Sequence, residues 1–426
     1  MKMKASGIEW IGKIPEEWNL ARIAALYSLR NTKVSDEDYP PLSVTMQGIL
    51  PQLETAAKTN DHDNRKLVRK GDFAINSRSD RRGSCGISEI DGSVSLINTV
   101  LRPNRQMNNR FYNWLFHTSL FSDEFYKWGH GIVDDLWTTN WQDMKKITVP
   151  YPPIIDQRRI ATFLDTKCAE IDALHANIEK EIATLEEYKK SVITEAVTKG
   201  LDPNVEMKES GVEWFPFVPL GWRFGRIKNV IDVLTDYTAN GSFGDLAKNV
   251  EYHDYEDYAR LIRLTDLREN LNNMGVYVNE YAYNYLGKSK LFGGEVLVAN
   301  VGAYAGLFCE MPTVNMPTSL APNMFLIRTN EIMDQHFLAY VGNSRFVWEQ
   351  LSQKAFASAQ PKLNKTDVKS VFVPIPPIDE QKAITNFLDT KCIEIEGIIT
   401  DKKTQLALLD SYKKSVIYEY VTGKKV

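Results

Sequence analysis

The chain has 426 residues, of which 43% are hydrophobic and 25% charged, and this composition is typical of a globular protein with room for two or three domains. It contains no apolar run of the length of a membrane span, and its first residues lack the apolar core of a signal peptide, so we expect a cytoplasmic protein without a membrane partner. The formal net charge of −4 argues against coating of a polyanion by the whole surface, although it leaves room for a local binding face.

A short motif opens each half of the chain. SGIEWIGKIPEEWNLARI begins at Ser6, and SGVEWFPFVPLGWRFGRI begins at Ser210, with tryptophans, prolines and arginines in register. Paired tryptophans can form a ligand cage, but they more often anchor a segment to the domain that follows it. We therefore predict that both motifs pack against their domains.

The first globular segment, residues 20–148, contains a loop with the composition of a DNA contact. KGDFAIN at Lys70 predicts a turn and a short strand, and SVSLINTVLRP at Ser93 predicts another strand. Arginines in the intervening loop can bind phosphate oxygens or a guanine edge, and Ser and Asn add shorter contacts. A solvated hairpin tip is an equally good interpretation. The candidate residues are Asn76, Arg78, Ser79, Arg81 and Arg82. A helix is predicted over residues 111–128.

The next stretch, Val149 to Thr198, occurs twice. Shifted by 224 residues it becomes Val373 to Thr422, and 26 of the 50 positions are identical. Such similarity at a fixed offset indicates two copies of one structural unit. Each copy begins with a proline-rich segment, which favours extended backbone and cannot continue a helix. A long stretch without proline follows, and it predicts a helix of about 65 Å at 1.5 Å per residue.

Apolar residues recur every seven positions along both predicted helices and form a heptad seam, which requires a partner helix. The predicted seam residues are Leu164, Ile171, Ile178, Leu185, Val192, Leu388, Ile395, Leu409 and Val416. A second line is predicted at Leu174, Tyr188, Ile398 and Tyr412. The length and the duplication favour an antiparallel pair of helices. Two ordinary amphipathic helices buried in one globule are the alternative.

The second globular segment, residues 223–372, follows the same plan of strand, glycine-rich loop, strand and helix. Its loops have diverged from those of the first segment far more than the long helices have. Similar supports that carry different loops are typical of a protein with two recognition domains. By loop composition alone, its candidate DNA contacts are Lys288, Lys290, Asn300, Tyr304 and Lys362.

No catalytic motif survives inspection. LGKS at Leu286 lacks the leading glycine and the preceding strand of a phosphate loop. No glycine-rich AdoMet loop follows a strand, and the histidines and cysteines fall in no metal-ligand spacing. We therefore expect no catalytic residue, no metal site and reduced cysteines.

Over essentially its whole length the chain resembles the specificity subunit of type I restriction-modification systems. The resemblance rests on the SGIEWIGKIPEEW start, the proline segments that end in Gln157 and Gln381, the IxxFLD helix starts and the two YKKSVI segments. It implies an α+β fold: two mixed α/β target recognition domains joined by two long antiparallel coiled-coil helices, with an internal pseudo-two-fold repeat. The implied domains are residues 1–148 and 201–372, and the implied helices are residues 149–200 and 373–426. Asp156 departs from the pattern, because the second copy has Glu380 there.

The resemblance also implies the function. A non-catalytic subunit of this kind would bind double-stranded DNA, and each domain would read one half of an interrupted sequence. The helices would set the spacing and dock two methylation subunits, with two restriction subunits in a restricting complex. AdoMet, ATP and Mg are expected on these partners and no cofactor on this chain. Two rivals remain, a coiled-coil scaffold that binds only protein and a stand-alone modifying enzyme that binds AdoMet or a nucleotide.

Overall fold

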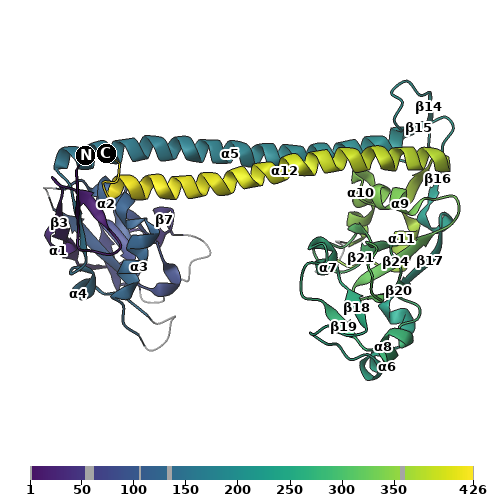
Figure 1. Ribbon diagram of the computed structural model, residues 1–426, viewed down its shortest axis with the longest axis horizontal. Coiled ribbons are helices and arrows are strands. Elements are labelled where there is room, and N and C mark those ends of the chain that lie inside the picture. The colour runs from purple at the N-terminus through teal and green to yellow at the C-terminus, as the bar shows by residue number, and fades with distance from the viewer. Residues whose placement is uncertain (1, 53–61, 105–106, 132–136, 356–359, 426) are drawn as a thin grey trace. The chain divides into compact units, whose positions relative to one another are not determined.

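The computed structural model describes residues 2–52, 62–104, 107–131, 137–355 and 360–425. The chain forms two compact units: unit 1 comprises Met1–Glu179 and Lys403–Val426, and unit 2 comprises Lys180–Lys402. Each unit contains one globular part and a piece of each long helix (Figure 1). Each unit therefore combines segments that are far apart in the sequence. No helix within the described ranges is both long enough and apolar enough to cross a membrane.

Unit 1 is built around a four-stranded antiparallel sheet in the order β10-β9-β12-β4. The segment between β4 and β12 also forms a three-stranded sheet, in the order β11-β8-β5, and a hairpin of β6 and β7. The strands are β4 (Tyr27–Arg30), β5 (Lys33–Val34), β6 (Leu42–Thr45), β7 (Gly48–Pro51), β8 (Arg65–Val68), β9 (Phe73–Asn76), β10 (Cys85–Ile87), β11 (Gly92–Val94) and β12 (Asn98–Pro103). The predicted strand in KGDFAIN is confirmed as β9.

Unit 2 has an equivalent antiparallel sheet in the order β17-β24-β21-β22. Its second sheet, β19-β18-β23-β20, differs from that of unit 1 because β18 and β23 pair in parallel. The strands are β17 (Ile231–Asp236), β18 (Ala259–Ile262), β19 (Val276–Val278), β20 (Lys290–Leu291), β21 (Val296–Ala299), β22 (Phe308–Glu310), β23 (Thr318–Leu320) and β24 (Met324–Thr329). The shared plan of the two halves is thus confirmed in the main sheets.

The helix predicted in each globular segment is two helices. Unit 1 has α2 (Asn109–Phe116) and α3 (Ser119–Lys127), and unit 2 has α9 (Gln335–Gly342) and α10 (Arg345–Ala355). The prediction of one continuous helix over residues 111–128 is wrong because Thr118 starts a new helix there. Its hydroxyl accepts a hydrogen bond from the backbone N–H of Phe121 at 3.3 Å.

Both proline segments are strands that lead into long helices. β13 (Thr148–Tyr151) pairs with β3 (Asn19–Arg22), and β25 (Phe372–Ile375) pairs with β16 (Arg223–Arg226). The helices α5 (Ile154–Lys199) and α12 (Ile378–Val421) then run for 46 and 44 residues. The predicted extended segments and long helices are confirmed.

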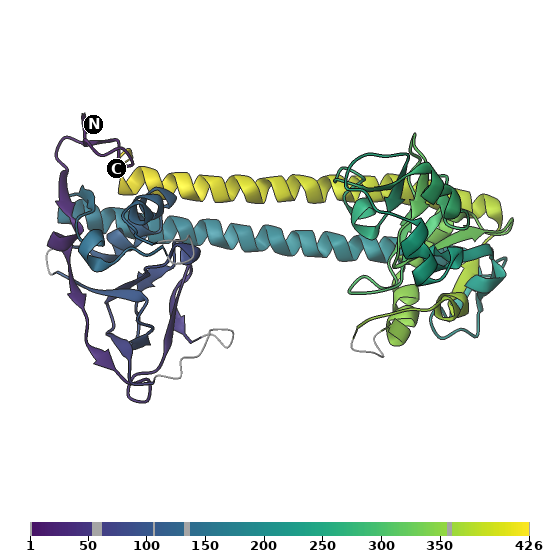
Figure 2. The ribbon, with the colours of Figure 1, turned by 90° about the horizontal axis from the view of Figure 1, so that it is seen from below.

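The long helices run antiparallel within each unit. In unit 1 the rings of Phe163 and Tyr420 stack with centroids 4.3 Å apart, and His175 lies 3.7 Å from Asp410. A higher residue number on α5 thus meets a lower number on α12. In unit 2 the same trend holds for the ion pairs Glu181 with Lys402 and Lys189 with Glu396. Figure 2 shows the end of α12 beside the start of α5.

The predicted heptad seam is buried or half-buried along its length, and its ends at Leu164, Leu388 and Val416 join the cores of the globular parts. Leu164, Ile171, Ile178, Leu388, Ile395 and Val416 are buried, and Leu185, Val192 and Leu409 are half-buried. The predicted second line is wrong: Leu174, Tyr188, Ile398 and Tyr412 are exposed. The buried second line, which includes Cys168, Ile182, Cys392 and Ile399, follows the first by four residues instead of three. Both spacings place a residue on nearly the same helix face, so only the position of the partner helix distinguishes them.

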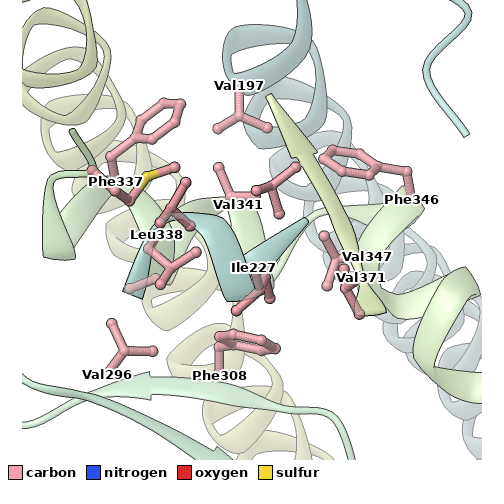
Figure 3. Close-up of a cluster of buried hydrophobic side chains, with 14 of the residues drawn as sticks. Val197, Ile227, Val296, Phe308, Phe337, Leu338, Val341, Phe346, Val347 and Val371 are labelled. Carbon is pink, nitrogen blue, oxygen red and sulfur yellow. The ribbon is translucent and has the colours of Figure 1, made fainter. Parts of the chain in front are cut away.

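The two tryptophan motifs pack as predicted. Trp18 and Trp222 are buried in the cores of their units. The first motif contacts the segment that follows α12, where Lys424 Nζ donates to the carbonyl of Ile11 at 3.3 Å. In unit 2, the core joins Val296 and Phe308 of the sheet to α9 and to Val197 of α5 (Figure 3).

A buried glutamine attaches each globular part to its long helix. Gln157 accepts from the backbone N–H of Asn108, the N-cap of α2, at 2.8 Å and donates to the carbonyl of Pro152 at 2.8 Å. Gln381 makes the same bonds to Asp334, the N-cap of α9, and to Pro376, both at 2.8 Å. Both glutamines are 0% exposed, so this part of the proline motif has a structural role.

The aspartate of each FLD sequence makes a second attachment. Asp165 of α5 pairs with Arg110 and accepts from the indole of Trp114 at 2.7 Å. Asp389 of α12 accepts from His336 at 2.8 Å and from the hydroxyl of Tyr340 at 2.7 Å. In each unit the two partners stand four residues apart on the first helix of the globular part. The attachment is thus equivalent in the two units, but the basic partner of the aspartate is an arginine in unit 1 and a histidine in unit 2.

Candidate nucleic-acid interface

Two loops at equivalent ends of the main sheets hold most of the predicted DNA contacts. The arginine loop, residues 77–84, joins β9 to β10, and the tyrosine loop, residues 300–306, joins β21 to β22. Both are tied to the chain before the last short helix of the globular part. The carbonyl of Ser77 accepts from Thr139 N–H at 3.0 Å, and that of Asn300 accepts from Leu363 N–H at 2.8 Å.

These ties bring some predicted residues together. Val301 bridges to Lys362, so Asn300, Tyr304 and Lys362 belong to one cluster of unit 2. The equivalent bridge in unit 1 joins Arg78 to Thr138. The segments 138–140 and 362–364 lead into α4 (Trp141–Met144) and α11 (Lys365–Ser370), whose N-caps are the predicted equivalents Asn140 and Asn364.

Asn76 shapes the arginine loop. It is buried, its side-chain oxygen accepts from the N–H of Arg78 at 3.0 Å, and its own N–H donates to the carbonyl of Ser84 at 2.8 Å. These bonds close the loop across its neck. The side chain of Ser79, another candidate, lies outside the described residues.

Arg78 is half-buried, whereas Arg81 and Arg82 are exposed but partly neutralised. Arg81 lies 3.6 Å from Asp80, and Arg82 lies 3.2 Å from Asp123. Arg82 also sits over the ring of Tyr126, 5.2 Å from its centroid. Exposed ion pairs of this kind are weak, so phosphate oxygens can replace the carboxylates.

Two candidates of unit 2 belong to another sheet. Lys288 adjoins the edge strand β20, and its Nζ donates to the carbonyl of Ala239 at 3.0 Å. Lys290 lies in β20, and its Nζ donates to Asn284 at 3.0 Å and lies 4.1 Å from the ring centroid of Tyr283. Both lysines therefore support local structure.

The cluster around the tyrosine loop contains one cation that the sequence did not reveal. Arg268, the last residue of α7 (Leu264–Arg268), lies over the ring of Tyr304 with Cζ 4.2 Å from the centroid. Arg268 and Lys362 are exposed, as is Tyr304, whereas the side-chain oxygen of Asn300 is buried without a partner among the described residues. No motif marks Arg268, because it lies more than thirty residues before the loop that it contacts.

The described parts of the chain hold no group of three or more His, Cys, Asp or Glu side chains that could bind a metal ion. The pKa of the half-exposed His336 is raised to about 9. Its hydrogen bond with Glu310 contributes most to this shift, and Asp389 adds to it. Since His336 joins α9 to Glu310 of β22 and to Asp389 of α12, its raised pKa reflects structural contacts.

Comparison with known proteins shows that this chain is similar to members of one family. Residues 219–406 match the family described as the type I restriction modification DNA specificity domain. The MjaVIII specificity subunit, a type I restriction enzyme subunit of Methanocaldococcus jannaschii, is 23% identical, and the match covers 97% of this chain and 94% of that protein. The EcoBI specificity subunit of Escherichia coli is 25% identical over 65% of this chain, which spans 58% of that protein's length.

Solved structures share the fold. A chain from a structure of complex assembly and conformational transition in the type I R-M system has a TM-score of 0.72 at 15% identity, covering 97% of this chain and 99% of that one. The HsdS subunit from Thermoanaerobacter tengcongensis has a TM-score of 0.53 at 16% identity, covering 97% of this chain and 98% of that one. The predicted resemblance and the α+β fold class are confirmed.

Proposed function

We propose that this chain selects the DNA target of a type I restriction-modification complex, because residues 219–406 match the type I restriction modification DNA specificity domain and the chain is similar over 97% of its length to a type I specificity subunit. The globular part of each unit reads one half of an interrupted double-stranded sequence. The chain itself is not an enzyme in this proposal. AdoMet, and ATP with Mg, are used by partner subunits.

One observation carries the proposal: the attachments of the two globular parts are equivalent, whereas the loops that they present differ. Gln157 and Gln381 make the same bonds, and Asp165 and Asp389 hold the same helix positions. The equivalent loops nevertheless read SRSDRRGS and NVGAYAG. Direct readout of bases depends on the side chains of such loops, so one scaffold can present two different readers.

The long helices support the proposal of two methylation subunits. Both carry exposed apolar side chains at equivalent positions: Phe163 and Phe387, Leu174 and Ile398, Tyr188 and Tyr412. Exposed aromatic and aliphatic residues in a row are typical of protein interfaces. Two equivalent rows suit two copies of one partner. The continuous helices would also set the spacing between the half-sites.

Mapping of methylated bases tests this function. Cells that carry the partner methylation subunit would be compared with and without this chain by long-read sequencing of their DNA. We expect one interrupted motif that is methylated only when the chain is present. A methylation pattern that ignores the chain would favour the coiled-coil scaffold, and methylation by the purified chain alone would favour the modifying enzyme.

A further inference from the structure

The tyrosine loop of unit 2 lies where unit 1 has the arginine loop, but it contains no basic residue. Residues 300–306 read NVGAYAG, whereas the arginine loop contains Arg78, Arg81 and Arg82. Polyanion binding by equivalent loops requires positive charge in both units. In unit 2, other segments provide that charge.

Arg268 is a cation that lies against the loop. Its Cζ is 4.2 Å from the ring centroid of Tyr304, whose side chain is 45% exposed. An arginine over an aromatic face is held by a cation–π interaction and keeps its donors at the edge of the guanidinium available. Arg268 forms no ion pair with any carboxylate in the part of the chain that the structure describes, whereas Arg81 and Arg82 do.

The segment that carries Arg268 is fixed from within. Asp266 is 0% exposed and accepts from Arg263 N–H at 2.7 Å, from Asn273 at 2.8 Å and from Arg260 at 3.3 Å. Burial raises the pKa of this carboxyl, but the hydrogen bonds from Arg263 and Asn273 and the charge of Arg263 together lower it below its usual range. Asp266 is therefore a charged hub that holds α7 rigidly.

Backbone strain marks the end of the same segment. Leu271 has a φ of 60° and Asn270 a φ of 50°. This left-handed region is one that asparagine tolerates but that a leucine rarely adopts. The conformation persists because Leu271 N–H donates to the carbonyl of Asp266 at 2.8 Å and its carbonyl accepts from Arg260 at 3.0 Å. Strain that the surroundings maintain is common at binding sites.

From these contacts we propose that Arg268, positioned by Tyr304, reads a guanine edge in the half-site recognised by unit 2, an inference that rests on the proposed function. The planar guanidinium can donate two parallel hydrogen bonds to O6 and N7 of guanine in the major groove. A side chain already confined by the tyrosine ring loses less freedom on binding than a free one. Lys362 is exposed beside the loop, where its ammonium group can bind a phosphate.

The test compares Arg268→Lys, Arg268→Ala and Tyr304→Ala in the assembled methyltransferase, by methylation mapping and by binding to duplexes with single base-pair changes. Arg268→Lys keeps the charge but loses the planar fork. We expect roughly a 5- to 150-fold loss of discrimination at one base pair of one half-site, since a bidentate pair is worth about 1–3 kcal/mol. Tyr304→Ala removes the ring that positions Arg268 and should reduce discrimination at the same base pair.

Arg345→Ala is the matched control, because Arg345 is an exposed arginine of the same unit that pairs with Glu349 at 2.9 Å away from the tyrosine loop. It should leave the target unchanged. Unaltered discrimination in Arg268→Lys would overturn the inference, as would equal weakening of all sequences with a smaller salt dependence, which identifies a phosphate contact. If Arg268→Ala fails to assemble, Arg268→Lys decides. A wild-type complex without sequence preference would instead contradict the proposed function.

Discussion

The indole of Trp222 donates a hydrogen bond to Glu380 Oε2 at 2.9 Å, and this bond is missing from the other copy of the unit. Trp18, the equivalent of Trp222, is buried, and its Nε1 has no partner among the described residues. The position of Glu380 is taken by Asp156, which is shorter by one methylene and pairs with Arg159 at 3.1 Å. The buried indole N–H thus has an acceptor in unit 2, whereas the equivalent N–H in unit 1 has none among the described residues.

Replacement of Asp156 by glutamate should satisfy that donor. We expect Asp156→Glu to raise the free energy of unfolding of unit 1 by about 1 kcal/mol, since a buried donor without a partner costs roughly 1–3 kcal/mol. The exposed pair with Arg159 contributes little. Urea denaturation measures the change. Glu380→Asp, the reverse exchange, should destabilise unit 2, and an unchanged midpoint in both variants would contradict the explanation.

His336 should make the attachment of α9 dependent on pH. Its pKa is raised from 6.5 to about 9, so its contribution to stability is complete below about pH 6.5 and is lost as the pH rises past 9. The melting temperature of the wild type should therefore fall over this range. His336→Arg introduces the residue type found at the equivalent Arg110 and should remove this part of the decline. Identical pH profiles of the two proteins would disprove the role of His336.

The buried glutamines should be essential to each unit. Gln157→Ala leaves the N–H of Asn108 and the carbonyl of Pro152 without their partner, and we expect a loss of about 1–3 kcal/mol in the free energy of unfolding. Gln381→Ala should have a similar effect on unit 2. Gln405→Ala removes an exposed glutamine from α12 and serves as the control, with a change of about 0.5 kcal/mol or less. Equal effects of Gln157→Ala and Gln405→Ala would count against this attachment.

The arginine loop should act only on the half-site read by unit 1. In the assembled methyltransferase, alanine at Arg78, Arg81 or Arg82 should relax one base pair by about 1–3 kcal/mol if that arginine reads a base. If it binds phosphate, all sequences should weaken alike and the salt slope should fall by about 1. Binding to single-change duplexes over a range of salt concentrations separates these results. Wild-type affinity and specificity in the triple variant would show that the loop is a solvated hairpin tip.

The long helices should determine the spacer of the DNA target. One heptad inserted after Ala176 and another after Thr400 lengthen each helix by about 10 Å and keep the seam in phase. That length corresponds to about three base pairs, since a turn of roughly ten base pairs rises about 34 Å. Methylation mapping should reveal a longer spacer between unchanged half-sites, or loss of binding because the groove has also rotated. An active variant with the old spacer, or with new half-sites, would exclude the helices as the spacing element.

Local pattern was sufficient for the repeated architecture. The fixed offset of 224 residues, the proline segments and the seven-residue period of Leu164, Ile171 and Ile178 predicted two copies of a strand followed by a long helix that needs a partner. These signals are reliable because extended proline segments and helix periodicity depend on neighbouring residues alone. The break at Thr118 was missed because a threonine within an apolar helix pattern is a weak cap signal until its hydroxyl is seen to accept a bond.

Only the tertiary structure decided which side chains meet. Ile182 is buried and Leu174 is exposed, because the position of the antiparallel partner decides whether the second buried line follows the first by three or by four residues. It showed that Gln157, which the sequence presents only as part of a motif, is buried and attaches the globular part to the long helix. It also placed Arg268 over Tyr304, a contact between residues far apart in the chain. Such contacts depend on how strands and helices pack, and packing is a property of the whole unit that no single segment of sequence contains.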